Sequence, residues 1–178
     1  MDTFQKLIQQ LKQTSHLELV GKNFSNETVS NQSVQCSVLG EITFFNVDFR
    51  DVDFIGSHIV GCNFNNCLFD NVMLIKCEFW NSNFEDCQII KSNLTRASFN
   101  NGNFKNCIFR NVKLTASEFS DFKFIETKFQ NSELDFILAR SIEISKSNQF
   151  LEIEKSLNFE EILKEANMST DQDEGERP

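Results

Sequence analysis

A five-residue period runs through the middle of the chain and constrains its fold more than any other feature. Every fifth residue from Leu19 to Leu134 is Phe, Leu, Ile or Val, without an insertion or a gap. The position two residues earlier holds a small side chain in nearly every unit from Ser37 onward, with Ile42 and Phe122 as the exceptions. Such repeats build solenoids, in which each unit is covered by its neighbours. The period therefore predicts one elongated repeat domain.

The spacing of the two apolar positions indicates how each unit runs. A separation of two places both side chains on one side of an extended segment, and the following separation of three requires the backbone to turn. Four equal corners close a square in 20 residues, so that successive coils stack as parallel strands about 4.8 Å apart. The corner positions are rich in Asn and Asp, which tolerate turn geometry and can form ladders between coils. Examples are Asn46, Asn66, Asp86 and Asn106.

At this point a family resemblance can be stated. The units Cys62-Asn63-Phe64-Asn65-Asn66 and Ser92-Asn93-Leu94-Thr95-Arg96 are similar to the consensus of the pentapeptide-repeat proteins. The resemblance covers residues 19–134 and implies an all-β solenoid, namely a right-handed quadrilateral parallel β-helix of about six coils. Three residues depart from the small-residue position in the first coil, which is therefore expected to be irregular: Lys22, Glu27 and Gln32.

The pattern divides the chain into four segments. Residues 1–18 carry apolar side chains at helical spacing and are predicted to be an N-terminal helical cap. Residues 19–134 form the β-helix, and residues 135–168 a C-terminal cap that contains a second helix. That second helix either closes the last coil or joins two copies in a homodimer. Residues 169–178 are polar and acidic, and are predicted to be a disordered tail.

Cysteine usage indicates a reducing compartment. Five of the six cysteines occupy the small-residue position, so they are interpreted as interior fillers rather than as a disulfide framework. Cys67, Cys87 and Cys107 stack in one column, where three thiols could hold Cu(I), but the filler interpretation is preferred. We predict no metal and no cofactor. With neither a secretory signal nor a membrane-spanning apolar run, the chain is expected to be cytoplasmic.

Charges and histidines exclude several functions. The formal net charge is −9, of which the repeat body contributes only −3, from 10 Lys and Arg against 13 Asp and Glu. No basic cluster supports direct binding to nucleic acid. The two histidines, His16 and His58, show neither triad nor metal-ligand spacing, and the six glycines form no phosphate loop. The chain is predicted not to be an enzyme.

The predicted site is a surface patch. Five apolar residues occupy outward positions and are expected to converge about one corner in the middle coils: Ile55, Val60, Met73, Ile75 and Trp80. An exposed apolar cluster often binds a partner, although the C-terminal segment could also cover it, or its members could lie scattered. The preferred function is a non-catalytic protein-interaction or regulatory module with an unknown protein partner. The resemblance implies an alternative, a DNA mimic that binds a type II topoisomerase such as gyrase and protects it from quinolones.

Overall fold

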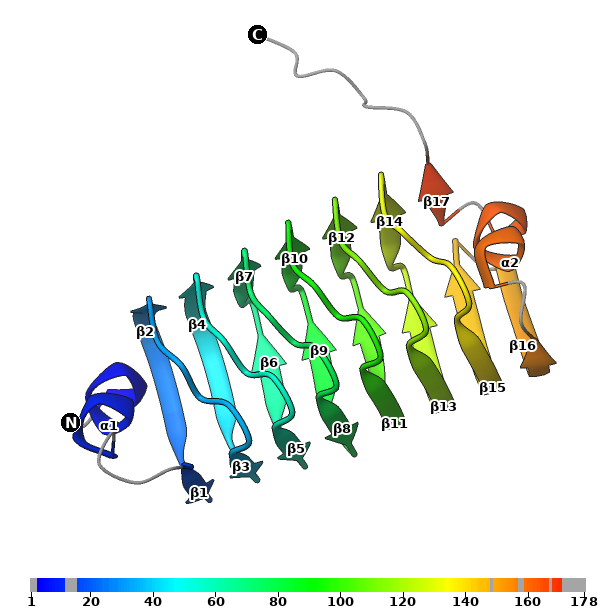
Figure 1. Ribbon diagram of the computed structural model, residues 1–178. Helices are drawn as coiled ribbons and strands as arrows, with labels where there is room; N and C mark the ends of the chain where they lie inside the picture. Colours follow the sequence, from blue (N-terminus) through cyan, green and yellow to red (C-terminus); the bar gives the residue numbers. More distant parts are fainter. Residues whose placement is uncertain (1–2, 12–15, 148, 157–158, 167, 171–178) are drawn as a thin grey trace, which may run out of the picture.

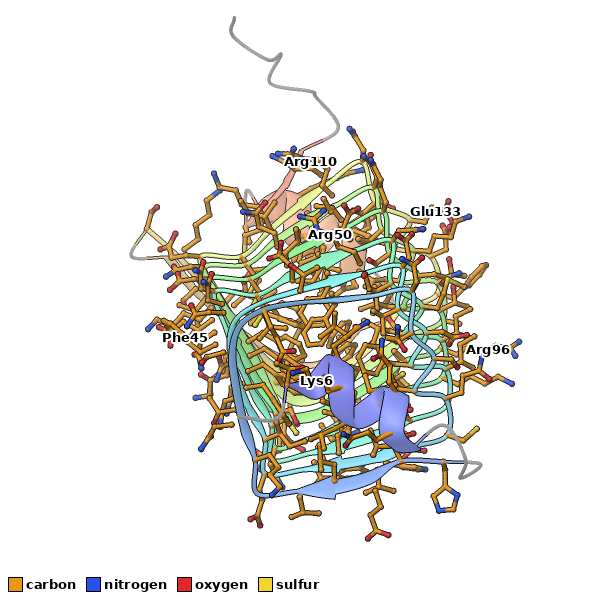
Figure 2. The ribbon with its side chains drawn as sticks, turned by 90° about the vertical axis from the view of Figure 1, so that its left-hand side faces the viewer. Lys6, Phe45, Arg50, Arg96, Arg110 and Glu133 are labelled. Carbon is orange, nitrogen blue, oxygen red and sulfur yellow. The ribbon has the colours of Figure 1, made fainter. Side chains whose placement is uncertain are left out.

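The computed structural model describes residues 3–11, 16–147, 149–156, 159–166 and 168–170. Successive coils of the chain stack into a four-sided tower with a helix at each end (Figure 1). From residue 18 to residue 146 the strands pair in parallel and join residues that are 20 positions apart, as in Phe44↔Phe64↔Phe84. Figure 2 looks along the axis from the N-terminal end. The chain passes clockwise from Phe45 to Arg50 and Arg96 as it recedes, so the coil is right-handed.

The four sides are named faces A to D in chain order. Face A is built by β1 (Glu18–Val20), β3 (Val38–Gly40), β5 (His58–Val60) and β8 (Glu78–Trp80). Face B contains β6 (Asn63–Asn65) and β9 (Asn83–Glu85), and three strands bend from face A to face B: β11 (Ser98–Lys105), β13 (Glu118–Ile125) and β15 (Leu138–Lys146). Face C contains β7 (Leu68–Asp70), β10 (Gln88–Ile90), β12 (Ile108–Arg110) and β14 (Lys128–Gln130). Two strands bend from face B to face C: β2 (Asn23–Ser30) and β4 (Thr43–Arg50). Face D is held by single bridges from Ser33↔Asp53 to Lys113↔Glu133.

Each corner of the tower contains a residue with a left-handed backbone. From Gly21 to Ser141, every fifth residue has φ between 47° and 68°. Asn and Asp fill many of these positions because they tolerate this conformation better than other residues with a side chain. Their amides also join neighbouring coils: Asn46 donates to Asn26 Oδ1 at 2.8 Å, and Asn66 donates to Asn46 Oδ1 at 3.2 Å. The predicted role of Asn and Asp at the corners and in ladders is confirmed.

The interior is a set of stacked rings. On face B the rings of Phe44 and Phe64 lie 5.1 Å apart and those of Phe64 and Phe84 lie 4.6 Å apart, each pair nearly parallel. Most of the buried hydroxyls of the polar small residues find partners in backbone carbonyls. Ser92 Oγ, for example, donates to the carbonyl of Ile90 at 2.9 Å. Buried polar groups are tolerated when they are bonded in this way.

The two exceptions to the small-residue rule fit the interior without breaking it. Phe122 is fully buried, and its ring lies 5.0 Å from that of Phe104. Directly below it in the ladder is Gly102, whose missing side chain leaves room for the ring. Ile42 is fully buried too. Phe122 is therefore accommodated in a small-residue column because the preceding coil provides the space.

The N-terminal cap explains why the first coil departs from the consensus. In α1 (Phe4–Leu11) the ring of Phe4 is fully buried, 5.1 Å from the ring of Phe24. Glu27 Oε1 accepts from the backbone N–H of Phe4 at 3.0 Å, at the positive end of the helix. Gln5 pairs its side-chain amide with both backbone groups of Ser30. The first coil keeps its register with the second, so the expected irregularity is wrong.

The solenoid ends later than predicted. The boundary was placed at Leu134, but β15 pairs with β13 in the same register, with Phe119↔Ala139 and Phe124↔Ile144. After Ser141 the next left-handed residue is Ser147, six positions on, and the chain turns back as β16 (Gln149–Ser156), antiparallel to β15. The register continues through β15 because small and apolar side chains, such as Ala139, still fill the interior.

A second helix and a short strand complete the C-terminal end. The ring of Phe159 in α2 (Phe159–Glu165) is buried and lies 5.5 Å from that of Phe119, so the helix closes the last coil. Beyond it, β17 (Ser169–Thr170) pairs with β14. The predicted tail therefore begins with two residues of strand, and residues 171–178 lie outside the described residues.

Replacement of Gly102 by Ala should destabilise the tower severely. A Cβ there would lie 2.1 Å from the backbone oxygen of Ser82 and 3.0 Å from the ring of Phe122. We expect a loss of about 3 kcal/mol or more in the free energy of unfolding, measured by denaturant titration. Gly40→Ala is the matched control, because its Cβ would meet only the side chain of Val20, at 3.3 Å. Equal losses for the two variants would contradict the packing described here.

Replacement of Glu27 by Ala should loosen the N-terminal cap. The variant loses the acceptor for the first N–H groups of α1, which we expect to cost about 1 kcal/mol. Faster hydrogen exchange at the α1 amides, together with a small drop in melting temperature, would report the change. Glu41→Ala removes an exposed carboxylate from a corner of the next coil and should leave exchange in α1 unaltered.

Candidate interaction surface

Two of the five predicted patch residues are neighbours on face A. Val60 in β5 and Trp80 in β8 are directly paired in adjacent coils. Their side chains are 39% and 45% exposed. Each follows a buried residue, Ile59 or Phe79, and therefore points away from the interior.

The other three predicted residues lie on face D. Met73 occupies the bridge to Asp53, and Ile55 and Ile75 each come two positions later in their coils, after the buried core residue. All three are half-buried. The corner that contains Gly56 separates them from Val60 and Trp80. The predicted patch is thus divided between two faces.

Face A carries a longer apolar row than the sequence suggested. Val20 is paired with Gly40, Gly40 with Val60 and Val60 with Trp80, and Val20 is 52% exposed. We call Val20, Gly40, Val60 and Trp80 the apolar row. Gly40 lacks a side chain and is buried, and the side chain of Val20 lies against it. Sorting the outward residues by the period of 20 would have found Val20 and Gly40, since each member of the row comes 20 positions after the one before it.

A carboxylate beside the row holds the Trp80 side chain. Trp80 Nε1 donates to Glu78 Oε2 at 3.5 Å, and His58 Nδ1 lies 3.2 Å from the same oxygen. These side chains are all exposed or half-buried, and the contact with Trp80 is long, so these interactions are weak. His58 is a surface residue, as predicted, and His16 is also exposed.

A family comparison now identifies the repeat. The model of the pentapeptide repeats matches residues 48–86 and 92–131, in eight copies. The chain contains pentapeptide repeats. The predicted right-handed four-sided β-helix of about six coils, with a helix at each end, is confirmed.

Several solved structures resemble this chain. A pentapeptide repeat protein of the Arabidopsis thaliana thylakoid lumen is 23% identical, with 62% of this chain and 70% of that chain covered, at a TM-score of 0.40. QnrB1, a plasmid-mediated fluoroquinolone resistance protein, is 18% identical, with 72% and 73% covered, at 0.30. The protein Rfr23 from the cyanobacterium Cyanothece is 10% identical, with 79% and 95% covered, at 0.31. No curated protein matches the sequence.

The five repeat cysteines of this chain are buried, whereas Cys36 is exposed at a corner. Their thiols bond to backbone carbonyls, as Cys77 Sγ does to Phe54 O at 3.0 Å. Burial raises the pKa of Cys62 to about 11 and that of Cys77 to about 12. In the stacked column the pKa of Cys67 is also raised, mainly by its hydrogen bond with the Cys87 thiol.

Two further observations concern metal sites and membranes. Among the described residues, no three His, Cys, Asp or Glu side chains come together in a way that could hold a metal ion. Within the same residues, no helix is long and apolar enough to cross a membrane.

One cysteine should react and five should not. Because the thiolate is the reactive form and burial raises the pKa of Cys62 and Cys77, few of these thiols ionise at about pH 8. We expect a thiol reagent to modify Cys36 quickly in the folded chain, and all six cysteines only after unfolding. Cys36→Ser should abolish the fast phase. Fast modification of a second thiol would show that the repeat interior opens.

Proposed function

We propose that the chain is a non-catalytic protein-interaction module that binds a partner protein through the apolar row on face A. The observation that carries this proposal is the alignment of Val20, Val60 and Trp80, all more than a third exposed, along one side of a straight parallel sheet. Exposed aromatic and aliphatic side chains on a preformed surface bind partners at little cost in conformational entropy, and Trp is enriched among residues that dominate binding energy.

The form of the surface supports a protein partner over a small-molecule substrate. Face A is a ladder of short strands held on both sides by neighbouring coils, and the row lies along the tower axis over four coils. A partner can follow this row with an extended segment or a helix. Small ligands bind mostly in concave sites.

The charges do not favour the alternative of a DNA mimic. A mimic presents free carboxylates at the spacing of phosphates, whereas many carboxylates here are paired with cations of the same face. Examples are Asp70 with Arg50 at 3.0 Å and Glu133 with Lys113 at 3.1 Å. The repeat body has a net charge of only −3, from 10 basic and 13 acidic residues. We therefore keep the interaction module as the proposed function.

The proposal predicts that substitutions on face A, and not on face D, remove the partner. The double variant Val60→Ser with Trp80→Ser should lose capture of a protein that the unaltered chain retains from a lysate of its source cell. Ile55→Ser with Ile75→Ser is the control, because it replaces two apolar side chains by serine in the same two coils but on the neighbouring face. Both variants should melt close to the unaltered chain, since their side chains lie at the surface.

The outcomes separate the candidate functions. A partner lost only with the face A variant supports the proposal, and its affinity for the purified chain should fall about tenfold or more if Trp80 is an anchor. Equal capture by both variants would exclude the apolar row as the binding surface. Capture of a type II topoisomerase by all three chains would instead support the DNA mimic.

A further inference from the structure

Three exposed cations of face C form no ion pair among the described residues. Lys91 lies at the corner that follows β10, Arg110 in β12 and Lys128 in β14, so they come from three successive coils and cross the face diagonally. We call these three residues the basic strip. The other outward residues of these strands, and the corner residues that follow them, are neutral: Gln88, Ile90, Ile108, Asn111, Gln130 and Asn131. Figure 2 shows Arg110 on the same side of the tower as Arg50.

The basic strip differs from the first coils of the same face, where opposite charges neutralise each other. Arg50 lies 3.0 Å from Asp48 and 3.0 Å from Asp70. In contrast, Arg110 Nε donates to a neutral partner, Gln130 Oε1, at 2.9 Å. In the part of the chain that the structure describes, neither Lys91 nor Lys128 forms an ion pair.

The carboxylates at the neighbouring corner between faces B and C are already engaged. Asp86 accepts from Asn106 Nδ2 at 3.0 Å, and Glu126 accepts from the backbone N–H of Ser147 at 2.6 Å. Neither of these bonds involves the basic strip, so among the described residues no carboxylate forms an ion pair with Lys91, Arg110 or Lys128. The three cations are therefore open to a further acidic group.

The chain itself returns to this place with an acidic segment. β17 continues the row of face C strands in Figure 1, with Phe129↔Ser169 and Gln130↔Thr170 as its pairs. Phe129 donates its backbone N–H to the carbonyl of Met168 at 2.7 Å, which fixes the direction of the chain. Eight residues follow Thr170, and they contain four carboxylates and one arginine: Asp171, Gln172, Asp173, Glu174, Gly175, Glu176, Arg177 and Pro178.

The length of this segment suffices to cover the basic strip. Eight extended residues reach about 26 Å. Lys91 belongs to a coil three levels below β17, which is about 14 Å away at the usual strand spacing. Because the segment is covalently attached through β17, its effective concentration at the strip is roughly millimolar. At that concentration even weak ion pairs lead to measurable binding.

We propose that the acidic residues 171–178 bind back along face C and shield the basic strip formed by Lys91, Arg110 and Lys128. The strip is then a docking surface for an acidic peptide segment, and the chain's own C-terminus occupies it as a competitor. This inference goes beyond the proposed function, because it concerns a different face and a different class of partner. Exposed ion pairs are individually weak, so the contact is expected to be sensitive to salt.

The test compares the full chain with a chain that ends at Thr170, by amide chemical shifts in NMR spectra. At about 20 mM salt we expect differences at and around Lys91, Arg110 and Lys128, and at about 500 mM salt we expect them to disappear. A synthetic peptide with the sequence of residues 171–178 should reproduce the shifts when added to the shortened chain. It should bind the full chain at least about threefold more weakly, because the tethered segment competes.

Two charge variants make the result specific. The triple variant Lys91→Gln, Arg110→Gln, Lys128→Gln should abolish the tail-dependent shifts. Its matched control removes three cations from other parts of the surface, Lys22→Gln, Lys76→Gln and Arg96→Gln, and should retain them. The proposal is overturned if the shifts are confined to the immediate neighbours of Thr170, if they persist at high salt, or if the control variant abolishes them equally.

Discussion

The left-handed corner that recurs every fifth residue is the constraint on which the rest of the structure depends. A residue with a side chain is strained in this conformation, by about 1 kcal/mol or more, so the tower accepts it only because each corner permits a new strand pairing. Asn and Asp lower that cost, and their amides then bond from coil to coil. Residues such as Phe136, which has φ 57° and is 82% exposed, show that the neighbouring pairings hold even an unsuitable residue in place.

Regular corners turn a one-dimensional sequence into columns. Because residues 20 positions apart always meet, each column repeats one kind of interaction over several coils. On face A, Phe79, Phe99 and Phe119 stack with ring centroids 4.6 Å and 4.9 Å apart. On face B, Lys105 bonds to Glu85 in the coil before it. Where a column changes character, as it does at Phe122, a neighbouring coil must compensate. Stability in such a tower depends on nearest neighbours along the axis.

The sequence predicted the repeat well because its signal is local and recurs without interruption. The inward positions, the corners and the two end helices all follow from spacing alone. The C-terminal boundary at Leu134 was too early, because the interior accepts Ala139 as readily as Phe or Leu and an aromatic consensus misses it. The role of Glu27 was hidden for a different reason: it depends on a contact between residues 23 positions apart, and no period encodes that contact.

The outward apolar residues about one corner were predicted from the sequence, and the structure places them on the two faces that meet there. The apolar row along face A was not predicted, since it is defined by residues from several coils and not by residues close in sequence. Val60 and Trp80 were found because they are apolar at outward positions, but Ile75 is nearer to Trp80 in sequence and lies on another face. Gly40 could not be recognised by composition, because its contribution is the absence of a side chain between Val20 and Val60. The backbone of the tower hardly varies from coil to coil, so its specificity for a binding partner must come from such columns. The apolar row lies on face A and the basic strip on face C. A partner that binds one of these surfaces therefore need not compete with a partner that binds the other.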